Sequence, residues 1–297
     1  MQLRTSIRAA GALALLALSH SLFAAPADAS ARPSFYVSVT GAGRPMILIP
    51  GLASAGDTYA GMVAHYASQY QCHVLTLAGF VGEPRIEAPF LETVRDELAR
   101  YIRDKHLDKP VIVGHSLGGF LALWLTETYP DLTGPVIIVD ALPFLPAVFQ
   151  PGATVDSVRG QAEQMRKAMI ASNEEQRRKS TESAVRAMVT SDANYQMVLG
   201  WSMRSDPVAV GNAMYDLFVH DLRPDESRVT SPVLVIGTWI GLKQYTTRDA
   251  VEKNFHAQYS GVKNLQFVMA DNARHFVMLD DPEWFLAQTD KFLDSRQ

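Results

Sequence analysis

A serine stands between two glycines at the end of an apolar run, in the segment Gly114-His115-Ser116-Leu117-Gly118. The run Val111–Val113 before it predicts a short buried strand, and the apolar segment Leu117–Tyr129 after it predicts a helix that Pro130 ends. A serine on such a sharp turn takes a strained backbone conformation, and the glycines carry no Cβ to clash across it. The turn places the Ser116 hydroxyl at a helix N-terminus, where backbone amides favour developing negative charge. The pattern therefore predicts a nucleophilic serine.

A serine hydroxyl is a weak nucleophile at neutral pH and needs a base to take its proton, a task that suits histidine. Among the eight histidines, His275 follows the last apolar strand by a short loop and precedes a helix, so it can return to the sheet edge where Ser116 lies. A capping role is the alternative for His275. His115 is next to the serine, but we expect it to point the other way, because neighbouring strand residues face opposite sides. The other histidines are expected at surface or packing positions, or in the N-terminal segment: His20, His65, His73, His106, His220 and His256.

Short apolar runs and helical patterns alternate along the chain, which predicts a mostly parallel sheet flanked by helices. The segments expected to be buried parallel strands are Phe35–Val39, Met46–Ile49, His73–Leu77, Val111–Val113, Val136–Val139, Val233–Ile236 and Leu265–Met269. Helices are expected over Thr58–Tyr70 and Leu91–Lys105, and a tight turn over Thr40–Pro45. The fold class is thus α/β.

One interval breaks this alternation, because residues 141–228 contain no convincing strand and are too long for a simple connection. Their composition predicts four helices, over Val155–Ala171, Glu174–Thr190, Asp192–Met203 and Asp206–Val219. We interpret residues 141–228 as a helical cap inserted over the C-terminal edge of the sheet. The core then consists of residues 28–140 and 229–297.

Three segments resemble the α/β-hydrolase superfamily, in its lid-bearing serine esterase and lipase-like branch: VIVGHSLGGF at 111–120, ILIPGLAS at 47–54 and ARHFVMLDDPEWF at 273–285. The resemblance implies the α/β-hydrolase fold, with Ser116 as nucleophile and His275 as general base. It also implies an oxyanion hole made by the backbone amides of Leu117 and of Leu52 or, as the second choice, Ala53. Where the family often has His-Gly, this chain has Pro50-Gly51.

The acid of a catalytic triad is where the chain departs from the commonest family pattern. The usual place is the loop after Val233–Ile236, but residues 237–243 contain no carboxylate. A minority of the superfamily carries the acid one strand earlier, and there Asp140 ends the strand Val136–Val139. We expect Asp140 to orient His275, the alternative being an aspartate that caps a loop or helix. The other candidates are Asp206, Asp216 and Asp221 in the cap, whereas Asp249, Asp271, Asp280 and Asp281 are typical of loops and helix starts.

Apolar residues beside the motifs indicate a substrate pocket, for which we select Phe80, Leu142, Trp239 and Phe276. The cap adds adaptable side chains that favour an apolar acyl or alcohol group: Met165, Met169, Met188, Met197, Trp201, Met203 and Met214. Packing of the cap onto the core explains the same residues equally simply.

Composition excludes several other classes of protein. The net charge of −4 over 297 residues gives no basic footprint for nucleic acid. No His/Cys/Asp cluster has metal-ligand spacing and no glycine-rich nucleotide loop is present, so no metal or cofactor is expected. The single cysteine, Cys72, cannot form an intramolecular disulfide.

Residues 1–27 are typical of a signal peptide, with two arginines, a short apolar run and small residues near the expected cleavage site.

These patterns predict a periplasmic or secreted serine hydrolase that cleaves small-molecule carboxylic esters and has no stable membrane span after signal removal. The same residues could act on lactones, thioesters, peptides or carbon–carbon bonds. Dehalogenases and epoxide hydrolases of this fold are disfavoured, because they carry an aspartate where Ser116 stands. The alternative from another class is a non-catalytic ligand-binding relative, against which the intact Ser116, His275 and glycines argue.

Overall fold

A seven-stranded sheet forms the centre of residues 32–295, which are the residues that the computed structural model describes; the predicted signal peptide, residues 1–27, lies outside them. The strand order is β1-β3-β2-β4-β5-β6-β7. The strands are β1 (Phe35–Thr40), β2 (Arg44–Ile49), β3 (Tyr70–Leu77), β4 (Val111–His115), β5 (Val136–Val139), β6 (Val233–Thr238) and β7 (Leu265–Ala270). Strands β2 to β7 pair in parallel, so the expected parallel sheet is confirmed for these six strands.

The first strand corrects one prediction. β1 runs antiparallel to β3, with Phe35 opposite Leu77, and its last three residues, 38–40, are exposed. The expectation of a buried parallel strand over Phe35–Val39 was therefore wrong. The apolar pattern indicates an extended segment but carries no information about strand direction, and an edge strand has only one neighbour to bury it.

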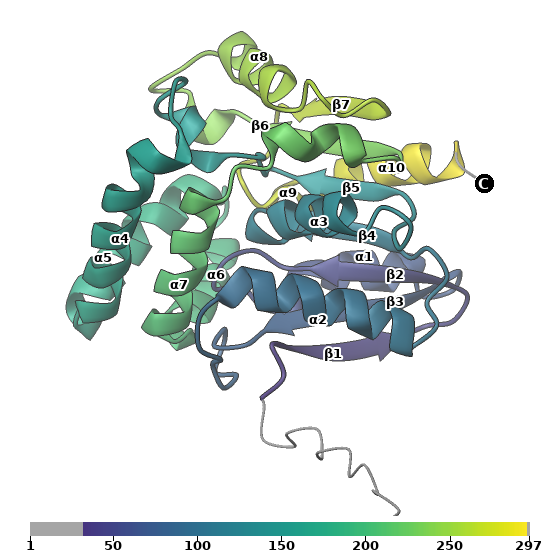
Figure 1. The fold of residues 1–297 in the computed structure, drawn as a ribbon, viewed down its shortest axis with the longest axis horizontal. Coiled ribbons are helices and arrows are strands. Elements are labelled where there is room, and N and C mark those ends of the chain that lie inside the picture. The colour runs from purple at the N-terminus through teal and green to yellow at the C-terminus, as the bar shows by residue number, and fades with distance from the viewer. Residues whose placement is uncertain (1–31, 296–297) are drawn as a thin grey trace, which may run out of the picture. The chain divides into compact units, whose positions relative to one another are not determined.

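Helices cover both faces of the sheet (Figure 1). On one face lie α2 (Phe90–Asp104), α3 (Leu117–Thr128) and α8 (Arg248–Gln258), and on the other α1 (Ala60–Tyr66), α9 (Val277–Asp280) and α10 (Pro282–Asp294). Strand β2 shows why both layers are needed: Ile47 and Ile49 face the first layer, whereas Met46 and Leu48 face the second, and all four are fully buried.

The predicted helix over Thr58–Tyr70 is shorter in the structure. A 3-10 turn, η1 (Gly56–Tyr59), precedes α1, and Tyr70 already belongs to β3. The tyrosines at both ends of this segment are buried in the core, so their spacing resembles a helical pattern even where the chain is extended.

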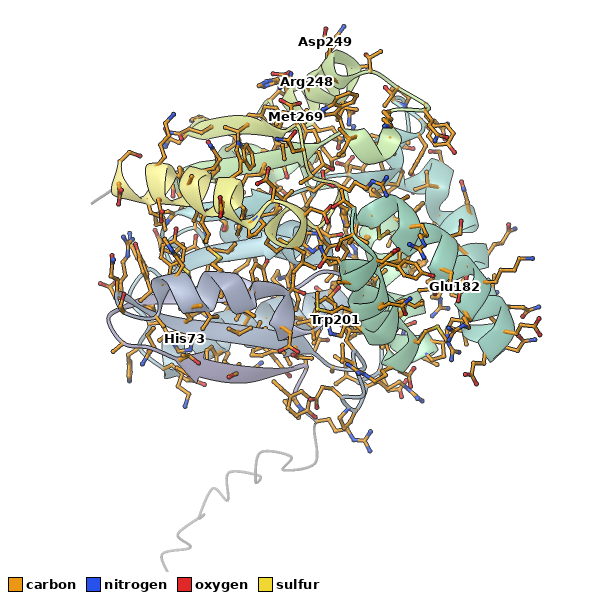
Figure 2. All side chains as sticks on the ribbon, turned by 180° about the vertical axis from the view of Figure 1, so that it is seen from behind. His73, Glu182, Trp201, Arg248, Asp249 and Met269 are labelled. Carbon is orange, nitrogen blue, oxygen red and sulfur yellow. The ribbon has the colours of Figure 1, made fainter. Side chains whose placement is uncertain are left out.

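Four helices stand between β5 and β6, where the cap was predicted, and Figure 1 shows them together at one end of the sheet. They are α4 (Val155–Ala171), α5 (Glu174–Met188), α6 (Asp192–Arg204) and α7 (Pro207–Val219), flanked by the 3-10 turns η2 (Leu145–Val148) and η3 (Arg223–Arg228). Each helix begins where a side chain accepts hydrogen bonds from the first turn: Thr154, Asn173, Ser191 and Asp206. Trp201 of α6 packs with the second layer of the core (Figure 2).

Candidate active site

Ser116 occupies the turn between β4 and α3. Its backbone angles are φ 53° and ψ −120°, a conformation that residues other than glycine rarely adopt. The flanking glycines are sterically required: a Cβ on Gly114 would lie 2.1 Å from the Gly118 carbonyl oxygen, and one on Gly118 would lie 2.1 Å from the Ile49 oxygen. The spacing of the motif therefore follows from the close approach of two backbone segments around a strained serine.

The Ser116 hydroxyl makes no hydrogen bond that stabilises the fold in the described residues. Ser116 precedes the first residue of α3, but its side chain makes no capping hydrogen bond. Its backbone N–H donates to the Val139 oxygen at 2.8 Å, and its carbonyl oxygen accepts from Phe120 N–H at 3.0 Å. Within residues 32–295 the Oγ atom has no hydrogen-bond partner, so it is available to a substrate.

Asp140 lies at the end of β5, next to the end of β4. Its Oδ1 accepts from the Thr238 N–H at 3.0 Å, and its Oδ2 accepts from the Thr238 hydroxyl at 2.7 Å. The same Oδ2 accepts a hydrogen bond of 2.6 Å from His275 Nδ1. Because a carboxylate only accepts, the proton of a neutral imidazole resides on Nδ1, and its Nε2 presents a lone pair. Asp140 and His275, predicted as acid and base, are thus brought together.

The other candidate acids have different partners. Asp216 accepts hydrogen bonds from the N–H groups of Phe90 and Leu91 at the start of α2. Four others bind arginines or backbone amides: Asp206 with Arg85, Asp221 with Arg223, Asp271 with Arg248, and Asp280 with Arg274 N–H. The side chains of Asp249 and Asp281 make no hydrogen bond or ion pair in the described residues. None of them contacts His275 through a hydrogen bond.

His115 lies against His275, contrary to the orientation expected from strand alternation. The two ring centroids are 4.6 Å apart, and the His115 Nε2–H donates to the His275 backbone oxygen at 3.0 Å. Burial, together with the neighbouring His275 imidazole, holds the pKa of His115 well below its ordinary value. The expectation that His115 faces away from the site was wrong, because the strand ends at His115 and the loop carrying His275 folds over it. The alternation of side chains along a strand does not predict where a distant loop packs.

His115 also connects the histidine pair to the loop after β2. A Cβ on Gly51 would lie 2.9 Å from His115 Nδ1 and 3.3 Å from Ser116 Cβ. The loop of Gly51 therefore touches the elbow, and His115 touches both this loop and His275. Ser116 follows His115 directly in the chain and His275 packs against the His115 ring, although no hydrogen bond joins Ser116 to His275 in this structure. Long catalytic hydrogen bonds are common before substrate binds.

Two backbone amides next to the elbow have no partner. The N–H groups of Leu52 and Leu117 donate no hydrogen bond within residues 32–295, and Leu117 is the first residue of α3. Helix-terminal amides of this kind stabilise negative charge. Ala53, the second choice for the oxyanion donor, has a positive φ of 53°. The loop thus turns sharply where an oxyanion donor is expected.

The four predicted pocket residues differ in exposure. Phe80 is fully buried against Phe90 in the core, and Phe276 is buried against the His115 ring, so neither lines an open space in this structure. Leu142 and Trp239 are partly exposed, and Trp239 Nε1–H donates to Asp271 at 2.8 Å. The pocket assignment stays a prediction, which the observed exposure favours for Leu142 and Trp239 alone.

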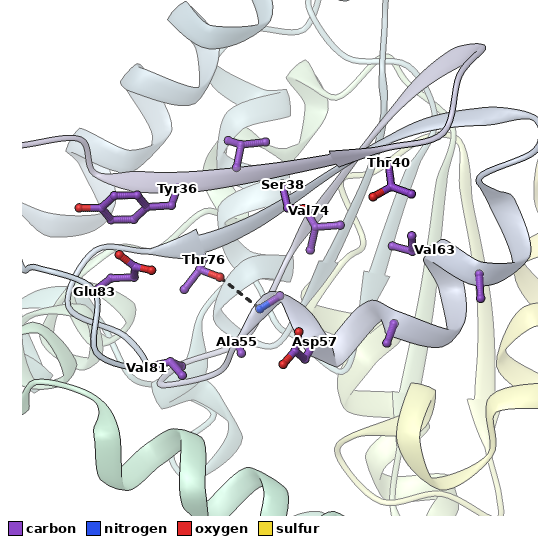
Figure 3. A pocket seen from close by; sticks show the side chains of 14 residues that line it. Tyr36, Ser38, Thr40, Ala55, Asp57, Val63, Val74, Thr76, Val81 and Glu83 are labelled. Carbon is purple, nitrogen blue, oxygen red and sulfur yellow. Dashed lines mark hydrogen bonds between the residues drawn. The ribbon is translucent and has the colours of Figure 1, made fainter.

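A surface groove of about 650 Å³ lies away from these residues, between β1 and β3 on one side and η1 with α1 on the other (Figure 3). Its lining includes Val37, Val63 and Val74 and two acids, Asp57 and Glu83, but none of the predicted catalytic residues. In the part of the chain that the structure describes, no group of three His, Cys, Asp or Glu side chains could hold a metal ion, and no helix is long and apolar enough to cross a bilayer.

A model of the α/β-hydrolase family matches residues 46–288, which is well over half of the sequence. The chain belongs to the α/β-hydrolase family. This agrees with the elbow, the sheet order and the resemblance found in the three motifs. The family assignment makes the protein a hydrolase, with esterases among its relatives.

The chain is similar to proteins of the same fold and, over part of its length, to an esterase. A pimeloyl-[acyl-carrier protein] methyl ester esterase of Aliivibrio salmonicida is 29% identical over 111 residues; the match spans 37% of this chain and only 41% of that relative. An enol-lactonase from Burkholderia xenovorans LB400 has a TM-score of 0.71 at 14% identity, covering 88% of this chain and 96% of its own. A thermophilic esterase from Thermogutta terrifontis has a TM-score of 0.72 at 17% identity, covering 88% and 93%. At such identities the two structures establish a common fold.

Proposed function

We propose that this α/β hydrolase is a serine esterase that cleaves small carboxylic esters through an acyl-enzyme. The observation that carries the proposal is the 2.6 Å hydrogen bond between Asp140 and His275, at the sheet edge that also carries a strained serine whose hydroxyl makes no hydrogen bond in the described residues. Support also comes from the partial match to a methyl ester esterase, since that relative's name describes ester cleavage.

In this mechanism the Ser116 oxygen attacks the ester carbonyl carbon while its proton passes to His275 Nε2. The carbonyl electron pair moves onto oxygen, where the N–H groups of Leu52 and Leu117 stabilise it; one such donor contributes about 3 kcal/mol in comparable sites. Collapse of this intermediate breaks the bond to the alcohol, which leaves with the proton from His275. Water then attacks the acyl group by the same route and releases the acid. Asp140 keeps the imidazole oriented throughout.

A panel of p-nitrophenyl esters of graded acyl length tests this proposal, with wild type compared with Ser116→Ala and His275→Ala. We expect wild type to hydrolyse at least one ester and both variants to lose about 10³-fold or more in kcat, as replacement of a nucleophile or its base does elsewhere. Ser180→Ala is the matched control, because Ser180 is exposed on α5. Unchanged hydrolysis by Ser116→Ala would contradict the proposal. Turnover confined to lactones, thioesters or peptides would retain the mechanism and change the substrate class.

We also propose that residues 1–27 direct the chain to the periplasm or the exterior, on the sequence pattern alone. The mass of the protein purified from its native compartment tests this. A mass short of the full chain by a segment ending between Ala24 and Ala29 is expected, and a full-length chain in the cytoplasm would contradict it.

A further inference from the structure

The loop that carries His275 is bonded to one corner of the cap. We call residues 271–281 the base loop and residues 186–194, where α5 ends and α6 begins, the cap corner. Phe276, directly after His275, donates its N–H to the Met188 oxygen at 3.2 Å. Arg274, directly before His275, donates from Nη1 to the Val189 oxygen at 2.8 Å and to the Arg186 oxygen. A guanidinium at this end of α5 satisfies carbonyls that the helix leaves without partners.

The Asp280 carboxylate joins the two segments. Its Oδ1 accepts from the Thr190 N–H at 3.0 Å and from Asn194 Nδ2 at 3.2 Å, both in the cap corner. Its Oδ2 accepts from the Arg274 N–H at 3.0 Å, in the base loop itself. Hydrogen bonds to an ionised carboxylate are roughly twice as strong as those between neutral groups. One side chain therefore holds the backbone N–H of the residue before His275 and ties it to the cap.

The main chain around His275 is thus held from three directions. Asp280 holds the Arg274 amide, the cap holds the Phe276 amide, and His115 in the sheet holds the His275 carbonyl. Asp140 fixes only the imidazole. A base whose ring is held by Asp140 still depends on its backbone position, and a displacement of 1 Å can cost about 100-fold in rate.

We infer that Asp280 is a positioning residue for the general base. Through Asp280, Arg274 and Phe276, the cap corner holds the His275 backbone in the position that proton transfer requires. This inference rests on the proposed function, since it assigns the cap a part in the same reaction. The cap corner then acts on the chemistry through the position of His275.

The test compares Asp280→Ala with Asp281→Ala. Asp281 is the adjacent acid, and its side chain makes no capping or other hydrogen bond in the described residues. The measurements are kcat and KM on the ester substrate, expressed per active site titrated with a fluorophosphonate, together with thermal unfolding. We expect Asp280→Ala to lose about 10- to 100-fold in kcat with little change in KM, and Asp281→Ala to stay near wild type. Equal kcat per titrated site in both variants would overturn the inference, whatever the loss of thermal stability.

Asn194→Ala provides a second route if Asp280→Ala does not fold. It removes one donor to Asp280 and one to the Leu279 oxygen from the cap side alone. We expect Asn194→Ala alone to lose severalfold in kcat. Where Asp280→Ala does fold, adding Asn194→Ala to it should cause no further loss, because residues of one network are not additive. Fully additive losses, or no loss, would overturn the coupling. Failure of the proposed function is seen separately, as hydrolysis that survives Ser116→Ala.

Discussion

Asp140 Oδ2 and His275 Nδ1 lie 2.6 Å apart, although the two residues are 135 positions apart in the chain. The short distance follows from topology: β5 lies between β4 and β6, so the end of β5 sits beside the elbow, and the base loop returns from β7. The same carboxylate is held by two donors from Thr238 at the end of β6. The neighbouring strand β6 therefore holds the Asp140 carboxylate in place, independently of its bond to the imidazole.

We expect Asp140→Asn to lower kcat by about 10³- to 10⁴-fold, because an amide at this position favours the wrong imidazole tautomer. KM and thermal stability should change little, since the amide fills the same space. Steady-state kinetics on the best p-nitrophenyl ester measure this. Asp249→Asn, at an exposed position in the first turn of α8, is the control and should match wild type (Figure 2). Near-normal turnover in Asp140→Asn would move the acid elsewhere.

Thr238 gives a second test of the same carboxylate. Thr238→Val keeps the shape of the side chain but removes the hydroxyl that donates to Asp140 Oδ2. A hydrogen bond to a charged group contributes about 1.5–3 kcal/mol, so we expect a loss of roughly 10-fold or more in kcat. Thr238→Ser, which keeps the donor, should remain close to wild type. Equal kinetics in the two variants would show that the hydroxyl does not matter to Asp140.

The sequence predicted those features that local patterns encode. Strand β5 matches its prediction at both ends, because the apolar run stops at Asp140. Ser116, His275 and Asp140 were predicted together because loops after parallel buried strands place their residues at one sheet edge, and the structure joins Asp140 to His275. The direction of β1 was missed, since alternation is the same in parallel and antiparallel strands.

Contacts between distant segments account for what the sequence did not predict at the site. His115 was assigned away from His275, and Asp280 was interpreted as a loop or helix-start residue. The partners of Asp280 in the cap are Thr190 and Asn194, 90 and 86 positions away. Contacts across such sequence separations depend on how the cap packs on the base loop. No local pattern near Asp280 predicts them.

His115 should stay neutral across the pH range of activity, because burial keeps its pKa well below the ordinary value. The acid limb of kcat/KM against pH should then follow one ionisation, with a slope of about one. His115→Phe keeps an aromatic ring against Phe276 but removes the donor to the His275 oxygen. We expect His115→Phe to have a lower kcat and an acid limb of the same slope as wild type. A steeper limb in wild type that becomes shallower in His115→Phe would show that His115 titrates during catalysis.

Two buried acids, Glu127 and Glu226, should contribute to the pH dependence of stability. Burial, and then the charge of Glu226, raises the pKa of Glu127 to about 9, and burial raises the pKa of Glu226 to about 7. Between the ordinary carboxyl pKa and these values the folded state binds more protons than the unfolded state. The free energy of unfolding should therefore fall as pH rises through this range, by up to about 1.4 kcal/mol per pH unit for each group.

We expect Glu127→Gln to remove part of this slope and to raise the free energy of unfolding at pH 8. Urea denaturation at pH 5, 7 and 8.5 measures it. Glu175→Gln, at an exposed position in the first turn of α5, is the control and should keep the wild-type slope. A Glu127→Gln protein with the wild-type slope would show that Glu127 is ionised in the folded state.

Covalent labelling with a fluorophosphonate, followed by mass spectrometry of the digested protein, tests the central assignment most directly. A single adduct on the peptide containing Ser116 is expected in the folded wild type, with slower labelling in His275→Ala and none in Ser116→Ala. Folded wild type that takes up no label, or an adduct that persists in Ser116→Ala, would contradict the assignment of Ser116 as the nucleophile.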